Sequence, residues 1–341
     1  MISVKNNLKQ LNQNLTWDKG VGILLVLTVI FGWVMTPDFA STSNLGFVLQ
    51  DIGEILIIAL PMTFLIIAGE IDLSVASTLS LASSTMGYAY RSGLGFGIAV
   101  FIGILVSILC GAINGFLVNY LGLQSLAVTI GTMGLFRGLC FVLLGNQPVN
   151  QLPDFWANLG SESIPHTFLP WSVVIIIPSV IIAWVVLHRT RVGRWTFVTG
   201  ISAEAARFSG IPDKRFKFWL FVATGFMSGV AAFVYTLRFA SASPDSATGY
   251  ELSVIAAVLF GGVSIAGGFG TMWGVLFSVL ELGAIRSVLQ LINFTANALQ
   301  MVSGALLLFS VALPRVIEML KTRREARVKP SVTSLTSSRS V

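Results

Sequence analysis

Charged residues are scarce in this chain. Of its 341 residues, 11% are charged and 55% are hydrophobic, whereas a soluble domain carries about 25% charged residues. A chain with so few charges cannot cover a water-facing surface on all sides, which argues against an ordinary soluble fold. The composition instead predicts an all-α fold, a polytopic bundle of helices embedded in a membrane.

Cysteine and histidine are nearly absent, with two residues of each. Cys110 and Cys140 both lie inside apolar runs, so they predict neither a disulfide framework nor a metal site. The sequence also lacks the G-x-x-x-x-G-K-[ST] phosphate loop and the common hydrolase and zinc-protease motifs. We therefore expect no catalytic residue, no bound metal and no cofactor in this chain, and we do not expect an enzyme.

Apolar runs occupy most of the sequence. A helix needs about 20 apolar residues to cross a bilayer, and the runs are too long for the strands of a membrane barrel. We expect about ten transmembrane helices, or eight if two of the less secure runs at 53–69, 74–91 and 251–266 are re-entrant. The expected spans are 21–35, 53–69, 74–91, 94–119, 125–144, 171–187, 217–237, 251–266, 271–290 and 296–313.

The basic residues predict the orientation of the chain. Lys and Arg concentrate at 187–217 and after residue 315, while the linker 146–170 has none. Because cytoplasmic segments are enriched in Lys and Arg, we expect both termini inside and the linker outside. The same rule accounts for the net charge of +6, because the basic residues lie in segments next to the membrane lipid. No nucleic-acid partner is needed to explain them. The expected parts are a cytoplasmic segment 1–20, a transmembrane domain 21–315 and a cytoplasmic, partly disordered tail 316–341.

Two carboxylates interrupt the apolar runs in the stretch Gly69-Glu70-Ile71-Asp72-Leu73-Ser74. A charge deep in a bilayer is costly, so these acids lie either at the membrane face or in a polar cavity. Asp72 and Ser74 also fit the start of a helix, where an acid meets the positive end of the dipole. A capping role and a direct role in a pathway both stay open.

Glycines are denser than helix packing needs in two places. Gly261-Gly262 and Gly267-Gly268-Phe269-Gly270 predict a broken helix or tight turns of the kind that line transporter pathways. Elsewhere, Gly103, Gly111 and Gly115 fit close helix packing in lipid.

Three ionisable residues fall inside expected spans: Arg137, Glu281 and Arg286. Such groups are functional candidates by default. Glu281 and Arg286 are five positions apart, a poor spacing for a same-face pair on one helix. Glu281 is the best proton- or ion-coupling group, and it supports an alternative hypothesis of an ion-coupled secondary transporter.

The basic segment 187–217 contains a short helix signal. Ser202 fits an N-cap, Ala205 and Ala206 favour helix and form a small surface, and Gly210 with Pro212 ends the pattern. An exposed helix of about two turns on the cytoplasmic side is expected there. It is either a docking element for a partner or an ordinary amphipathic loop helix.

Several of these motifs, taken in order, resemble one protein family. The stretch GEIDLSVAS at 69–77 is similar to the "GGIDLSVGS" signature of permease subunits in ATP-binding cassette importers for ribose and related sugars. Further similarities lie at Asn114-Gly115, 128–138, 190–211 and 249–271. Glu70 stands where glycine is usual and resembles rhamnose-type or autoinducer-2-type members.

This resemblance implies a helical permease without enzymatic activity of its own, in the bacterial inner membrane. It implies a second permease subunit, identical or different, two ATP-hydrolysing cassette subunits that bind the ATP, and a periplasmic solute-binding protein. It assigns coupling to the ATPase to Glu204, Ala205, Ala206, Arg207 and Gly210. It assigns the pathway or its gating to Glu70, Asp72, Ser74, Asn114, Thr129, Thr132, Gly261 and Gly262. The expected cargo is a monosaccharide or related small polar solute, ribose-, rhamnose- or autoinducer-2-like.

Overall fold

The computed structural model describes residues 2–150, 152–294, 301, 304, 305 and 308, and only the backbone of residues 2–16. Within this part of the chain the structure is all-helical, and extended segments meet only in two isolated bridges, Val149 with Ala242 and Ser163 with Pro170. The expected all-α class is confirmed there. In chain order the elements are α1 (Ile2–Met35), the 3-10 helix η1 (Pro37–Ala40), α2 (Thr42–Ile67), α3 (Val75–Arg91), α4 (Phe96–Asn119), α5 (Ser125–Leu144), α6 (Asp154–Ser161), α7 (Val173–Arg189), α8 (Arg191–Ile201), α9 (Ala203–Phe208), α10 (Asp213–Arg238), α11 (Tyr250–Phe260) and α12 (Met272–Leu291).

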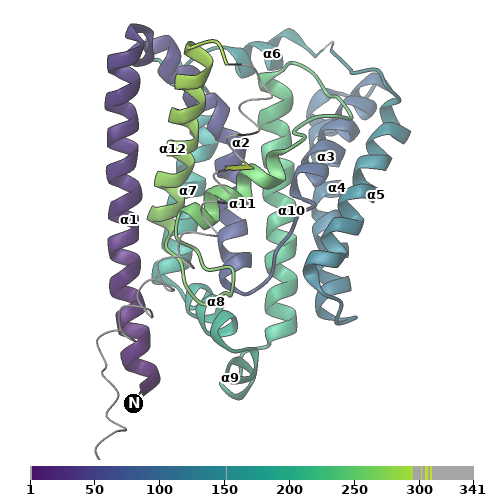
Figure 1. Cartoon of the computed structure of the whole chain (residues 1–341). Coiled ribbons are helices and arrows are strands. Elements are labelled where there is room, and N and C mark those ends of the chain that lie inside the picture. The colour runs from purple at the N-terminus through teal and green to yellow at the C-terminus, as the bar shows by residue number, and fades with distance from the viewer. Residues whose placement is uncertain (1, 151, 295–300, 302–303, 306–307, 309–341) are drawn as a thin grey trace, which may run out of the picture.

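Helix α2 forms the centre of the bundle. It is buried without interruption from Ile52 to Ile67 and packs against α7, α8, α10, α11 and α12. By contrast α1 lies at one edge, beside α12 (Figure 1). Helices α1, α4 and α5 expose large apolar side chains such as Val34, Phe101 and Val142. An apolar exterior of this kind suits lipid rather than water.

The described part contains six helices that are long and apolar enough to cross a membrane. They are α2, α4, α5, α10, α12 and the Trp17–Met35 portion of α1. A seventh crossing is counted if α7 and α8, which meet at a bend of 65°, form one broken span. These numbers are smaller than the ten expected, and the expected span 296–313 lies almost entirely outside the described residues.

Two expected spans differ from the observed helices. The run 251–266 does not form one helix, because α11 ends at Phe260 and a loop follows. Its 11 residues rise only about 16 Å at 1.5 Å per residue, roughly half of a bilayer core. Helix α2 begins at Thr42 rather than near residue 53, because its first three turns are partly polar and gave no apolar signal.

Small residues hold α4 against α10, as expected for helices in lipid. A side chain at Gly111 would meet the backbone of Phe221 and Gly225, and one at Gly115 would meet Phe218. The prediction that these glycines serve helix packing is confirmed.

Candidate functional site

The segment 68–74 joins the inner helix α2 to α3 and contains three of the predicted site residues. Gly69, with φ +84°, ends α2, and the next amide, of Glu70, donates to the Leu65 carbonyl at 3.0 Å. This is the 6→1 pattern of a glycine-terminated helix. The chain then turns back into the bundle, which places Glu70, Asp72 and Ser74 between helices.

Asp72, Ser74 and Asn114 form one buried hydrogen-bonded chain. The Ser74 amide and hydroxyl both donate to Asp72 Oδ1, at 2.8 and 2.6 Å. Asn114 Nδ2 of α4 donates to the Ser74 hydroxyl at 2.8 Å. Burial raises the pKa of the Asp72 carboxyl, and the Ser74 hydrogen bonds oppose that shift. Asp72 therefore braces the turn before α3, while Ser74, the N-cap residue, makes no side-chain capping bond of its own.

Glu70 makes an ion pair with Lys217 of α10, with 2.8 Å between Oε1 and Nζ. Both side chains are largely buried, so the pair ties the segment after α2 to the second turn of α10. The sequence singled out Glu70 in the stretch 69–74 and included Lys217 in the basic segment 187–217. It did not predict their contact, because the two residues are far apart along the chain.

The two predicted threonines of α5 have different surroundings. Thr129 donates to Ser125 O at 2.8 Å and lies 3.4 Å from Ile71 O, so it faces segment 68–74. Thr132 bonds only within its own helix, to Thr129 O at 3.4 Å. The structure brings Thr129 to the other predicted residues and leaves Thr132 apart from them.

The glycine-rich loop after α11 packs against the end of α2. Gly261 ends α11 against the backbone of Gly274 and Val275, and Gly262, with φ +88°, lies against Trp17. The Gly268 amide donates to the Ile67 carbonyl at 2.7 Å. The predicted tight turns are confirmed, and they bring this loop beside the start of segment 68–74.

Helix α9 projects from the end of the bundle that also carries the N-terminus, and α6 lies at the opposite end (Figure 1). Ser202 caps α9 by accepting from the Ala205 amide at 3.1 Å, and Gly210, with φ +78°, follows its end. The predicted short capped helix is confirmed. Ala206, however, is fully buried in the chain itself, so it is not free to contact a partner.

The exposed side of α9 has a feature that sequence reasoning missed. Phe208 is 87% exposed, at a tip that also carries Glu204 and Arg207. Arg207, which is exposed, reaches the buried carboxylate of Asp213 at 3.6 Å. An aromatic side chain this exposed, at the end of a capped helix, is suited to insertion into a partner's pocket.

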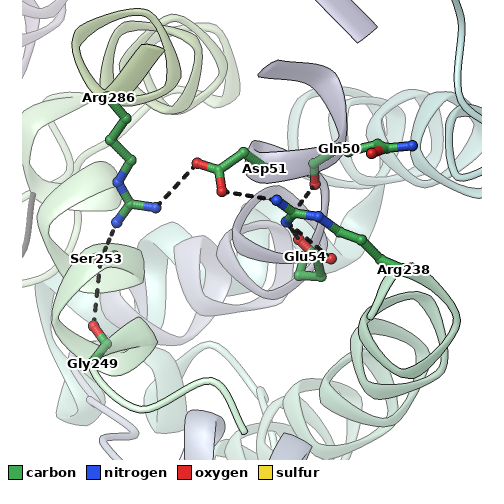
Figure 2. Close-up of polar contacts among 7 residues, drawn as sticks. All are labelled: Gln50, Asp51, Glu54, Arg238, Gly249, Ser253 and Arg286. Carbon is green, nitrogen blue, oxygen red and sulfur yellow. Dashed lines mark hydrogen bonds and ion pairs between the residues drawn. The ribbon is translucent and has the colours of Figure 1, made fainter. Parts of the chain in front are cut away.

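A second buried site, an ionic network, was also missed (Figure 2). Arg238, at the end of α10, lies 3.1 Å from Asp51 and 3.2 Å from Glu54, both of α2. Asp51 also pairs with Arg286 of α12 at 3.5 Å, and Arg286 donates to Ser253 of α11 at 2.8 Å. Two acids and two arginines thus neutralise one another while joining four helices.

The remaining intramembrane charges have specific partners. Arg137 Nη1 donates to the carbonyls of Pro244 and Ser246, each at 2.9 Å, and so holds the loop before α11. Glu281 is buried between α12 and α1, where its Oε1 accepts from Thr28 at 2.7 Å. In the described part of the chain, no group of three His, Cys, Asp or Glu residues is placed to hold a metal ion.

Comparisons with known proteins agree with this architecture. A family model described as "Branched-chain amino acid transport system / permease component" matches residues 44–311. The chain is 32% identical, over 91% of its length and 97% of the relative's, to the autoinducer 2 import system permease protein LsrD of Yersinia pseudotuberculosis. The protein of the same name from Yersinia enterocolitica is also 32% identical, over 92% of this chain and 98% of its own.

Proposed function

The chain belongs to the family of transport-system permease components, and from this premise we propose that it imports autoinducer 2 or a related small sugar across the bacterial inner membrane. The observation that carries the proposal is its full-length similarity to autoinducer 2 import permeases. Glu70 supports it, since an acid where glycine is usual resembles autoinducer-2-type members of the family.

We further propose that this multi-pass membrane protein works as the translocation subunit of an ATP-binding cassette importer. ATP would be bound and hydrolysed by separate subunits, a second permease would complete the pathway, and a periplasmic protein would deliver the solute. The support in this chain is α9, a short capped helix that projects from one end and carries exposed Phe208. An ion-coupled mechanism through Glu281 is less favoured, because the family model that matches this chain describes permease components of transport systems.

The proposed topology has both termini inside and ten passes between residues 21 and 315, with 1–20 and 316–341 cytoplasmic. The bundle supports it, since α9, in the most basic loop, and the N-terminus share one end while α6 lies at the other (Figure 1). Helix α11 and the loop 261–271 together would count as one pass. Segment 68–74 and the turns at Gly261 and Gly262 would be the parts of the pathway that move.

The test is transport by the reconstituted importer. The permease is placed in liposomes with its cassette ATPase, its partner permease and the solute-binding protein, and uptake of autoinducer 2 and of D-ribose is measured with and without ATP. We expect ATP-dependent uptake. Uptake driven equally by a proton gradient without ATP would contradict the proposal.

The role of α9 is tested in the same preparation. Phe208→Asp places a charge where an apolar contact with the ATPase is proposed. Solute uptake, and the stimulation of ATP hydrolysis by the permease, should both fall by at least tenfold, as expected for the loss of an interface anchor. Phe155→Asp, which alters another exposed phenylalanine, 69% exposed on α6, is the matched control. Equal effects of the two substitutions would remove α9 from this role.

A further inference from the structure

A groove of about 530 Å³ lies at the α6 end of the bundle, between the start of α2 and the loop 161–168. This volume is in the range of small-molecule binding sites. Close packing sets the position of the loop: a side chain at Gly46 would come within 2.9 Å of the Phe168 carbonyl. The bridge between Ser163 and Pro170 closes the loop on itself, so the groove has two fixed walls.

Uncharged hydrogen-bonding groups dominate the lining. The hydroxyls are those of Thr42, Ser43, Ser161, Ser163 and Thr167, and Gln50 and His166 add an amide and an imidazole. Ser161 and Thr167 donate their protons to carbonyls within their own turns, and Thr167 also accepts from the Leu169 amide at 3.2 Å, which leaves the Ser161 oxygen as the freer acceptor. Gln50 has both donor and acceptor atoms. The walls can therefore both donate to and accept from a ligand that carries several hydroxyl groups.

No Asp, Glu, Lys or Arg lines this groove. A zwitterion such as an amino acid would bring an ammonium and a carboxylate to a site without a counter-charge, which costs free energy on desolvation. A neutral solute pays no such cost. The rings of Phe47 and Phe168 offer apolar contact for the carbon skeleton of the ligand.

Gln50 connects the groove to the buried ionic network. It lines the groove and also a smaller cavity beside it, which Arg238 lines as well. Its backbone carbonyl accepts from Arg238 at 3.2 Å, while its side chain extends away from the guanidinium (Figure 2). The amide side chain is thus available to a ligand while the backbone is fixed.

We propose that this groove is an acceptor site, within a single permease subunit, for a neutral polyhydroxylated solute. The inference rests on the proposed function for the outward position of the groove and adds to it a site and a selectivity against zwitterions. Solute released at the α6 end would bind here before it moves on past Gln50.

The test measures direct binding, without transport. The complex of the two permeases and the cassette ATPase, in lipid nanodiscs and without the solute-binding protein, is examined by saturation-transfer NMR with autoinducer 2, D-ribose and L-rhamnose as neutral probes and L-leucine as the zwitterionic probe. We expect a signal for at least one neutral probe and none for leucine. Ser43→Trp should fill the groove and abolish the signal. Gln50→Leu should weaken binding about fivefold, the loss for one neutral hydrogen bond.

Asp245→Asn is the matched control, since Asp245 is an exposed polar residue outside the groove. This variant should bind as the wild type does. The absence of a signal for all three neutral probes, an equal signal for leucine, or a signal unchanged in both groove variants would overturn the proposal. Because binding is measured separately from ATP-driven uptake, a failure of the binding test leaves the proposed transport function standing. A failure of the uptake test likewise leaves the groove to be judged by its own binding data.

Discussion

Arg238 illustrates how a charge is accommodated inside a bundle that is otherwise apolar. Its guanidinium meets Asp51, Glu54 and the Gln50 carbonyl, so most of its donors have an acceptor. Glu54 itself is fully buried. A buried pair of this kind contributes little net stability compared with apolar packing, but breaking it leaves an uncompensated charge. The network is therefore best understood as a device that fixes α2 relative to α10 and α12.

Replacing Arg238 with Met should destabilise the protein strongly. The change leaves Glu54 and Asp51 without their main counter-charge, and the loss of one partner from a buried pair costs about 3–5 kcal/mol. The measurement is the temperature at which the purified protein in detergent loses its monodisperse peak, which should fall by several degrees. Arg194→Met is the matched control, because Arg194 lies exposed on α8, where a charge contributes roughly 0–1 kcal/mol. Similar shifts for the two variants would refute the role of the network.

At the scale of single elements, close approach of backbones decides how the helices pack. Helices α4 and α10 meet at Gly111 and Gly225, where neither has room for a side chain. On α5, by contrast, a side chain at Gly131 would meet nothing within 4 Å. Glycine in a helix is otherwise unfavourable by up to about 1 kcal/mol relative to alanine. The two positions therefore predict opposite responses to the same substitution.

Gly225→Ala should destabilise the protein, since the added methyl group meets the backbone of Ser107 and Gly111, which cannot move aside. Gly131→Ala should be neutral or slightly stabilising, because it improves helix propensity without a clash. Thermal stability in detergent and the yield of folded protein in the membrane fraction measure both. A stability loss of the same size in the two variants would contradict this account of α4–α10 packing.

For the molecule as a whole, the features that could be predicted are those specified by residues close together in the sequence. Ser202 with Gly210 predicted α9, and Gly261-Gly262 predicted a break. The ionic network had no local signal, because Arg238 contacts residues 184 to 188 positions away and no spacing rule connects them. The expected span 251–266 nevertheless ran past this break, because the apolar residues continue beyond Gly262, and only the packing of Gly261 on Gly274 shows that α11 ends at Phe260.

The orientation of the molecule is tested by labelling introduced cysteines. Both native cysteines, Cys110 and Cys140, are buried, so a membrane-impermeant maleimide should give little background. Glu204→Cys marks the α9 end, and Glu162→Cys marks the α6 end; both positions are exposed. Basic loops stay in the cytoplasm, so the Glu162→Cys variant should react in intact spheroplasts, and the Glu204→Cys variant only after permeabilisation. The reverse pattern would invert the topology and place α9 beyond the reach of any cytoplasmic ATPase.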